Sequence, residues 1–344
     1  MNSTRYSWQG ALLTVLTLAG TTIDCQVAAH ALLSVSPPAA ASRTSSTGSS
    51  SGLVHPGVLI TLPMLEQIRA NVRAKKEPQW SAYQSMLDPS HTIGPAEGGR
   101  GPVWLGNLSY EPAPVRNFTA NMSLSPGTRW LSDKEDALAA YTHALLWFIT
   151  EDKRYAAKAA EIMNAWAAML TTPIQAADGL EAAWSGTGWA RAAEIIKHTA
   201  DASVWPEENA TAFAKMLTDI YLPWVNEGAS TNGNIAMVMS ETYLHIGVFM
   251  DNRTIVDAAV ELYRKQVPAY VYTSKDGPTP KRPPVQRNLP NTGPVCGPQC
   301  SDAEIFNFWH GNRQFSGHDG VAQETCRDLG HTNMMFASLV ILAF

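Results

Sequence analysis

The sequence has little charge, few cysteines and no long hydrophobic run. Only 16% of its 344 residues are charged, and the formal net charge is -5. A mildly acidic chain without basic runs is a poor nucleic-acid binder, so we expect no nucleic-acid partner. No apolar run reaches the 18 or so residues that a membrane-spanning helix needs. We therefore expect no membrane partner either.

Residues 1–31 have the organisation of a secretory signal peptide. Arg5 supplies the positive charge, a short apolar core follows, and Ala29-His-Ala31 is a small-x-small cleavage site. Residues 32–52 are rich in Ser, Pro, Ala and Thr, a composition that cannot bury a core. We therefore predict a signal peptide, a disordered lead-in, and a secreted, extracellular protein with one domain at 53–344.

Secretion also agrees with five N-glycosylation sequons in the mature region, which predict a glycoprotein. They begin at Asn107, Asn117, Asn121, Asn209 and Asn252.

Of the four cysteines, Cys25 lies in the signal peptide, which leaves Cys296, Cys300 and Cys326 in the mature chain. Oxidising conditions favour a disulfide bond from Cys296 or Cys300 to Cys326, with one thiol unpaired. The alternative is a metal site on the CxxxC pair and the third cysteine.

From Thr61 onward the periodic segments are helical, and we find no convincing alternating strand pattern before the proline-rich region. The expected helices begin at Pro63, at the capping-box signature Ser132-Asp-Lys-Glu135, and after Asp152, and others cover 189–200, a segment from Pro206, 234–250 and 254–267. Successive antiparallel hairpins must bury their faces against neighbours, which predicts an all-α domain, an α/α toroid or a solenoid. No period of about 33–45 residues repeats, which disfavours the standard helical repeats.

Residues 310–333 concentrate polar groups, with three histidines, three acids and two arginines. Glycines make the first half a loop, and from about Val321 the pattern predicts a helix. On that helix Glu324, Arg327 and His331 would share one face at i, i+3 and i+7. A titratable imidazole, a fixed cation and a carboxylate suit proton transfer on an anionic substrate. The alternative is a salt-bridged surface helix.

Within this stretch the run HDGVAQETCRDLGHT resembles a segment of secreted proteins in the alginate lyase-like superfamily of polysaccharide lyases. Residues 232–252, which begin Asn-Gly-Asn, resemble a second helix of that family, with Ile235 in place of the family's Trp. The resemblance implies an α/α toroid and a lyase that cleaves an anionic uronic-acid polysaccharide by β-elimination, with alginate and glucuronan the leading substrates. In the resembling proteins the last helix continues and further hairpins follow. We therefore expect this chain to be truncated at its C-terminus, with an incomplete barrel.

Elimination requires that the C6 carboxylate be neutralised, the C5 proton be removed and the departing O4 be protonated. The candidate catalytic residues are His331, Arg327, Glu324, Asn234 and His318, and the candidate substrate-binding residues are Gln323, His310, Trp189 and Tyr272.

In this hypothesis Asn234 and Arg327 bind the carboxylate, because amide and guanidinium groups donate hydrogen bonds in fixed geometry. Glu324 orients Arg327, or donates a hydrogen bond itself if protonated. His331 is the base or acid, and His318 or His310 is its counterpart. Tyrosines 243, 270 and 272 are alternatives for the acid.

Other interpretations remain open for several of these residues. Asn234 is also typical of a helix cap, and Arg191 and Glu194 read as a helix-stabilising i, i+3 pair. The motif histidines lack HxxxH spacing on one helix, and the elimination can run without a cation, so we expect no metal and no cofactor. One rival function is a glycoside hydrolase, which needs two carboxylates, for which the candidates are Asp302, Glu304, Asp319 and Glu324. The other is an inactive carbohydrate-binding or cell-wall protein.

Overall fold

The computed structural model describes residues 51–92, 103–115, 126–170, 179–287, 295–313, 315 and 319–343. The predicted signal peptide, nearly all of the lead-in and the sequons at Asn117 and Asn121 lie outside these residues. The remaining sequon asparagines are partly exposed. Within the described part of the chain, no helix is long and apolar enough to cross a membrane.

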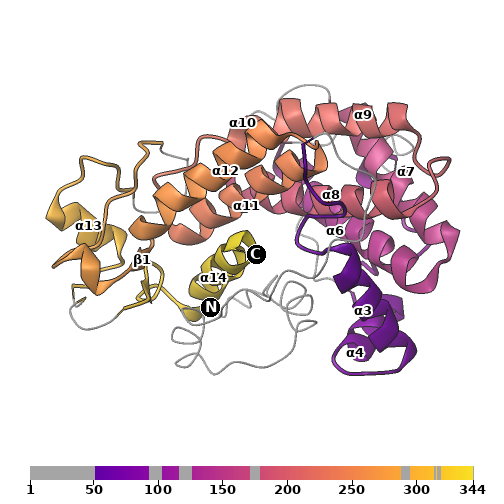
Figure 1. The fold of residues 1–344 in the computed structure, drawn as a ribbon, viewed down its shortest axis with the longest axis horizontal. Coiled ribbons are helices and arrows are strands. Elements are labelled where there is room, and N and C mark those ends of the chain that lie inside the picture. The colour runs from indigo at the N-terminus through magenta and orange to yellow at the C-terminus, as the bar shows by residue number, and fades with distance from the viewer. Residues whose placement is uncertain are drawn as a thin grey trace.

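Four helices form an inner row in which each packs against the next (Figure 1). They are α6 (Pro126–Thr150), α8 (Gly179–Thr199), α11 (Gly233–Phe249) and α14 (Leu329–Ala343). Nearly every residue of α11 is buried, as expected for a helix covered on all sides.

An outer row covers the inner one, and each outer helix follows its inner partner along the chain. It consists of α7 (Lys153–Met169), α9 (Glu207–Met216) with its continuations η2 (Leu217–Tyr221) and α10 (Leu222–Val225), and α12 (Arg253–Gln266). α7 packs on α6, η2 and α10 pack on α8, and α12 packs on α11. Since the connections are short, the pairs are antiparallel hairpins, and their two rows make an all-α, toroid-type fold.

The inner helices run parallel to one another, which gives the fold two distinct ends. An ion pair of 2.6 Å between Lys134 and Glu181 joins the third turn of α6 to the first turn of α8. A hydrogen bond of 3.0 Å from Trp147 Nε1 to Thr199 Oγ1 joins their last turns. The amino ends of the inner helices therefore meet at one end of the domain and their carboxyl ends at the other.

Two glycines of α8 allow the inner helices to approach closely. A Cβ atom at Gly188 would lie 3.1 Å from the Cβ of Ala137 in α6, and one at Gly186 would lie 2.5 Å from Thr242 Cγ2 in α11. The core on either side of this contact is aromatic and includes Trp166, Trp189, Phe213 and Phe249. Small residues set the spacing of the helices, and large ones fill the space between the rows.

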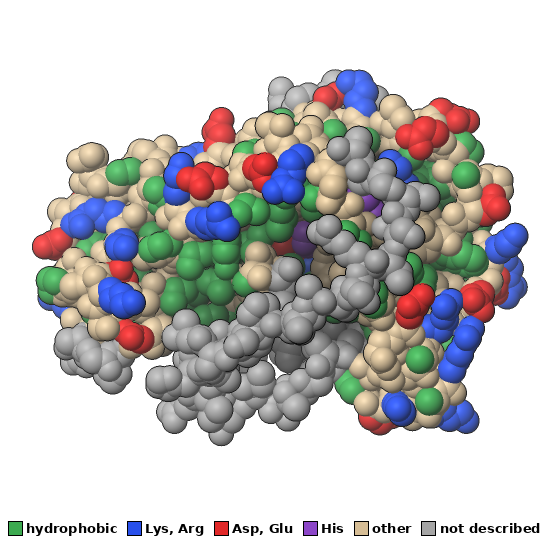
Figure 2. Space-filling view, viewed as in Figure 1, with side chains coloured by type: hydrophobic (Ala, Val, Ile, Leu, Met, Phe, Trp, Pro, Cys, Tyr) green, Lys and Arg blue, Asp and Glu red, His purple; other side chains and the backbone are tan. Residues whose placement is uncertain are grey.

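The smaller elements lie at the two ends of the helical array. At the start, α3 (Leu62–Arg73) packs on α4 (Gln79–Leu87) and on α6. Toward the C-terminus lie η3 (Val267–Ala269), β1 (Val271–Tyr272), η4 (Ser274–Asp276), α13 (Asp302–Phe308) and β2 (Val321–Ala322). The buried residues of α14 are Thr332, Met335, Ser338 and Ile341, which share one face of the helix. Figure 2 shows hydrophobic side chains gathered where this helix lies, while charged ones are scattered over the surrounding surface.

The helical prediction is confirmed, but two starting points are wrong. α6 begins at Pro126 and α8 at Gly179, each well before the predicted residue. Ser132-Asp-Lys-Glu135 lies inside α6, because its polar side chains bind across the helix row instead of capping a terminus. Asp133 accepts a hydrogen bond of 2.7 Å from Trp189 Nε1, and Lys134 pairs with Glu181.

The predicted helix from Val321 is also wrong at its start. Val321 and Ala322 form β2, which pairs antiparallel with β1 in the register Val271↔Ala322. A turn follows, and α14 begins only at Leu329. Asp328 starts that helix, because its Oδ1 accepts a hydrogen bond of 2.8 Å from the backbone N–H of His331.

The predicted disulfide pairing is wrong as well. Cys296 bonds to Cys300, at a Cα–Cα distance of 5.4 Å, and Cys326 is a free, exposed thiol. A turn closed by the hydrogen bond from Cys300 N to Gly297 O brings the bonded pair together.

Candidate active site

The candidate site lies at the amino end of α11, which is capped by a side chain from a distant segment. Asn232 occupies the N-cap position without a side-chain cap bond. Instead, the backbone N–H of Gly233 donates to Oε1 of Gln323 at 2.8 Å. Gln323 Nε2 donates to Asn232 Oδ1 at 3.2 Å and to the carbonyl of Phe308.

Gln323 is fully buried, and its side chain is held by two segments of the chain, at residues 232–233 and at Phe308. Both polar groups of its side chain are engaged within the protein, so its direct effect is on the geometry of the site. The short sheet supports the same placement, because Gln323 N donates to the carbonyl of Tyr270 at 2.9 Å. Together these bonds fix the turn that carries the next residues against α11.

Glu324 follows in that turn, and its carboxylate is 0% exposed. Its Oε2 lies 3.2 Å from Nε2 of His310 and 3.4 Å from Nη1 of Arg327. Oε1 is buried and has no hydrogen-bond partner in the described part of the structure. The predicted pair of Glu324 with Arg327 is present, and His310 is a second partner of the same oxygen.

The two partners of Glu324 are more exposed than the carboxylate. The side chain of Arg327 is 32% exposed and that of His310 is 16% exposed. His310 has a left-handed backbone, with φ 53°, where the chain turns after α13. Two groups that can carry positive charge therefore stand between a buried carboxylate and the surface.

Asn234 lies beside the Gly233–Gln323 hydrogen bond, in the first turn of α11. It is 1% exposed, and its Oδ1 has no hydrogen-bond partner among the described residues. The helix-cap interpretation is wrong for this residue, because Asn232 holds the N-cap position. A buried acceptor without a donor costs about 1–3 kcal/mol. A ligand that donates a hydrogen bond to this oxygen would satisfy it and would explain why it is left without a partner in the protein.

His331 is positioned by Asp328 in the first turn of α14. Its Nδ1 lies 2.7 Å from Asp328 Oδ2, and its side chain is 26% exposed. Burial acts to raise the pKa of Asp328, but the hydrogen bonds from the backbone and ring of His331 outweigh it and lower that pKa. Glu324 and Arg327 lie in the turn, so the prediction that they share a helix face with His331 is wrong. His318 lies outside the described residues.

Trp189 and Tyr272, predicted to bind sugar, are core residues. Trp189 is 0% exposed, and its Nε1 donates to Asp133 Oδ1 at 2.7 Å. Tyr272 is 1% exposed, and its hydroxyl donates to the carbonyl of Gly277 at 2.8 Å. Neither ring offers a face to a sugar, so both predictions are wrong.

The tyrosines considered for the acid role differ in their surroundings. Tyr270 is fully buried and donates to the carbonyl of Ala229 at 2.9 Å. Burial, with the charge of Glu324, raises the pKa of Tyr270 above its usual value, which makes it a weaker acid. Tyr243 keeps 9% exposure, and burial raises its pKa too. Of the two, Tyr243 is the one that solvent reaches.

A second buried polar cluster lies further along α11, and the partner predicted for one of its residues, Arg191, is wrong. Arg191 of α8 hydrogen-bonds to Oε1 of Glu241 rather than pairing with Glu194 as predicted. His245 Nδ1 lies 3.9 Å from the same oxygen. Burial, and then the charge of Arg191, hold the pKa of His245 well below its usual value.

Glu241 and His245 lie seven and eleven residues after Asn234, on the same face of α11. The available sequence signal was this row of polar residues in an otherwise apolar helix. It indicates a polar seam that runs from the candidate site into the domain.

One comparison with known protein families gives a match, and it covers most of the helical part of the chain. The family model described as alginate lyase matches residues 115–281, which include α6 to α12 and Asn234 and end before the turn at Gln323. No curated protein and no solved structure matches the chain. Residues 115–281 are therefore similar to the alginate lyase family, which confirms the resemblance predicted from the sequence.

Proposed function

We propose that this protein is a secreted polysaccharide lyase that cleaves a uronic-acid polysaccharide, alginate or glucuronan, by β-elimination. The observation that carries the proposal is the polar end of α11, where Asn234 and Glu324 are buried beside the partly exposed Arg327 and His310. Of these residues, Asn234 lies within the part of the chain that matches the alginate lyase family.

The first requirement of the reaction is a cationic or donor site for the C6 carboxylate. Arg327 offers guanidinium N–H groups beyond the single contact that it makes with Glu324. His310 also contacts the carboxylate of Glu324. The side-chain amide of Asn234 offers a further hydrogen-bond donor. Charge-assisted hydrogen bonds of this kind strengthen as negative charge develops on the substrate carboxylate.

The second requirement is a base near C5. In His331, a hydrogen bond from Nδ1–H to Asp328 would leave Nε2 unprotonated and able to accept a proton. The candidates that protonate the departing O4 are His318 and Tyr243, and Tyr243 is more exposed than Tyr270.

Two buried acceptors agree with a carbohydrate ligand. Oδ1 of Asn234 and Oε1 of Glu324 have no donor among the described residues. Sugar hydroxyl groups donate hydrogen bonds and would satisfy both atoms on binding, which removes the cost of leaving them unpaired.

The carboxylates considered for a hydrolase have other partners. Asp302 is 71% exposed and pairs with Arg282, and Glu304 accepts a capping bond of 2.7 Å from Ser301 N. Asp319 accepts from the backbone N–H of Ser274. No described feature therefore favours a catalytic acid pair over the elimination site.

The test is the near-ultraviolet absorbance of the unsaturated uronate, measured with the purified protein and its His331→Ala variant. Loss of a general base lowers rates by about 10²–10⁴-fold. The matched control is His91→Ala, because His91 also sits three residues after an aspartate, with Nδ1 at 3.1 Å from Asp88 Oδ2. We expect the control to keep full activity. Equal activity in His331→Ala would remove His331 from the mechanism, and polyuronate binding without turnover by the wild type would favour a binding protein.

A further inference from the structure

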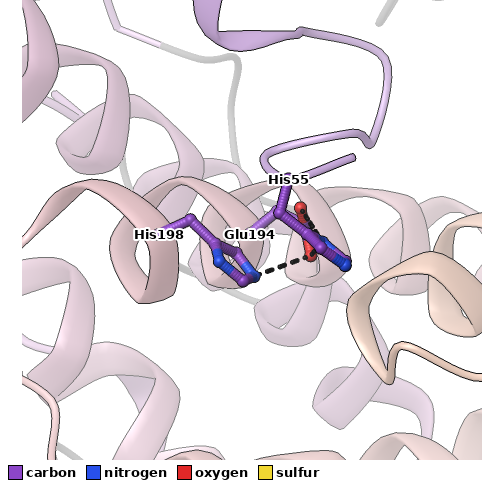
Figure 3. Close-up of side chains that lie close together, drawn as sticks. All are labelled: His55, Glu194 and His198. Atoms are coloured by element: carbon purple, nitrogen blue, oxygen red, sulfur yellow. Dashed lines mark hydrogen bonds and ion pairs between the residues drawn. The ribbon is translucent and has the colours of Figure 1, made fainter. Parts of the chain in front are cut away.

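Three potential metal ligands gather at the carboxyl ends of the inner helices, whereas the candidate active site lies at their amino ends. Glu194 and His198 lie one turn apart near the carboxyl end of α8, and His55 comes from the segment before α3 (Figure 3). One ligand atom from each residue can be chosen so that all three lie within 4.8 Å of one another. Asp251, which follows α11, lies beside the same group.

The three residues are already in contact. His55 Nδ1 lies 3.0 Å from Oε1 of Glu194, and His198 Nε2 lies 3.4 Å from the same oxygen. The other oxygen, Oε2, accepts a hydrogen bond of 2.9 Å from the backbone N–H of Gly57. Oε2 also lies 3.1 Å from His55 Nδ1, so both oxygens of the carboxylate contact His55, and Oε1 contacts His198 as well.

We propose that His55, Glu194 and His198 form a binding site for a divalent transition metal, with Zn²⁺ as the ion that best suits the ligands. Two imidazole nitrogens and one carboxylate oxygen are a donor set that zinc uses in proteins, with a fourth position left for water. The i, i+4 spacing of Glu194 and His198 places both on one face of α8.

The surroundings of His55 support the same assignment. Its second ring nitrogen, Nε2, lies 3.2 Å from Oδ1 of Asp251. A histidine that binds a metal usually donates its other N–H to a carboxylate, which fixes the tautomer and the ring orientation. Asp251 occupies that place, and Nδ1 is left to face Glu194 and His198.

Metal binding requires one rearrangement. The rings of His55 and His198 are stacked, with centroids 4.4 Å apart and an angle of 15° between their planes. A metal lies close to the plane of each imidazole that binds it, so two nearly parallel rings cannot share one ion as they stand. The side chain of His198 is 26% exposed, against 10% for His55, so His198 is the ring that can rotate.

A bound metal would fasten the segment before α3 to helix α8 of the inner row. His55 belongs to the segment that leads into α3, whereas Glu194 and His198 belong to the inner row. Asp251 follows Asn234 by 17 residues, which is about 25 Å along a helix, so the metal lies far from the elimination site. The sequence analysis expected no metal because it considered the histidines of residues 310–331, and His55 is 139 residues from Glu194.

The experiment uses the mature protein after removal of metals with a chelator, titrated with Co²⁺ and, separately, with Zn²⁺. We expect one equivalent of Co²⁺ to give visible absorption bands of a low-coordinate site, and Zn²⁺ to raise the unfolding temperature. His198→Ala should lose both responses. Asp251→Asn should weaken binding by about 10–100-fold, as the loss of a residue supporting a ligand does.

His91→Ala is the control, since it removes an exposed histidine that also pairs with an acid, and it should bind like the wild type. Circular dichroism establishes that each variant folds, and His198→Gln, which keeps more of the side chain's volume, replaces the alanine variant if that one unfolds. Absence of Co²⁺ bands from the wild type, or an equal zinc response in the folded His198 variant, would overturn the proposal. In that case the three residues form an ion-pair cluster only.

Discussion

Gln323 offers the sharpest test of how the candidate site is held together, through the substitution Gln323→Leu. Leucine has a similar volume and cannot form hydrogen bonds, so the buried Gly233 N–H and Phe308 C=O lose their partners. Each such buried group costs about 1–3 kcal/mol. We therefore expect the free energy of unfolding to fall by about 2–6 kcal/mol, a large part of the roughly 5–15 kcal/mol typical of a domain.

Urea denaturation followed by circular dichroism measures this change. The matched control is Gln67→Leu, since Gln67 Nε2 donates to Asn71 Oδ1 at 2.8 Å on the exposed surface of α3. Surface changes of this kind are usually worth no more than about 0.5 kcal/mol. If Gln323→Leu costs no more than the control, Gln323 does not hold the turn against α11, and our account of the site's geometry fails.

Three further predictions concern the core and the thiols. Burial raises the pKa of Asp133 to about 6 from an ordinary value of 3.8, so its contribution to stability is full below pH 4 and is lost as the pH rises to 6. That contribution is about 3 kcal/mol. Asp133→Asn should remove the change in unfolding free energy between pH 4 and 6. A variant with the same pH dependence as the wild type would contradict this prediction. Gly186→Ala should destabilise the protein by about 1–3 kcal/mol despite alanine's better helix propensity, because the new Cβ would lie 2.5 Å from Thr242 Cγ2. An unchanged unfolding free energy in urea denaturation would show that α8 and α11 can move apart. Without reductant a thiol reagent should label one cysteine of the mature protein, Cys326, and none in Cys326→Ser, whereas labelling of Cys296 by peptide mapping would disprove the disulfide.

The helices were largely predictable because their signals are local. Apolar residues at spacings of three and four define the buried faces of α7 and α12, and Asp152 and Asn252 cap them as side-chain acceptors. These signals need only residues within a turn or two. The Ser132-Asp-Lys-Glu135 signature misled because its side chains bind residues of a helix some 50 positions away, and those contacts outweigh the local motif.

The candidate site was predicted in part, because its motif is local whereas its geometry is not. Glu324 and Arg327 do pair, as their spacing of three residues allows. The strand before them depends on Tyr272, about 50 residues earlier, and two paired residues leave no period in the sequence. The partner of Arg191 is likewise on another helix, so the local i, i+3 pattern indicated Glu194 instead of Glu241.

The measurement that tests the central claim most directly is digestion of alginate, polymannuronate, polyguluronate and glucuronan in heavy-oxygen water. Elimination breaks the C–O4 bond without adding water, so we predict unsaturated products that absorb in the near ultraviolet and carry no solvent oxygen. Products that incorporate solvent oxygen and do not absorb would identify a hydrolase. That result would contradict the β-elimination proposed for Asn234, Arg327 and His331.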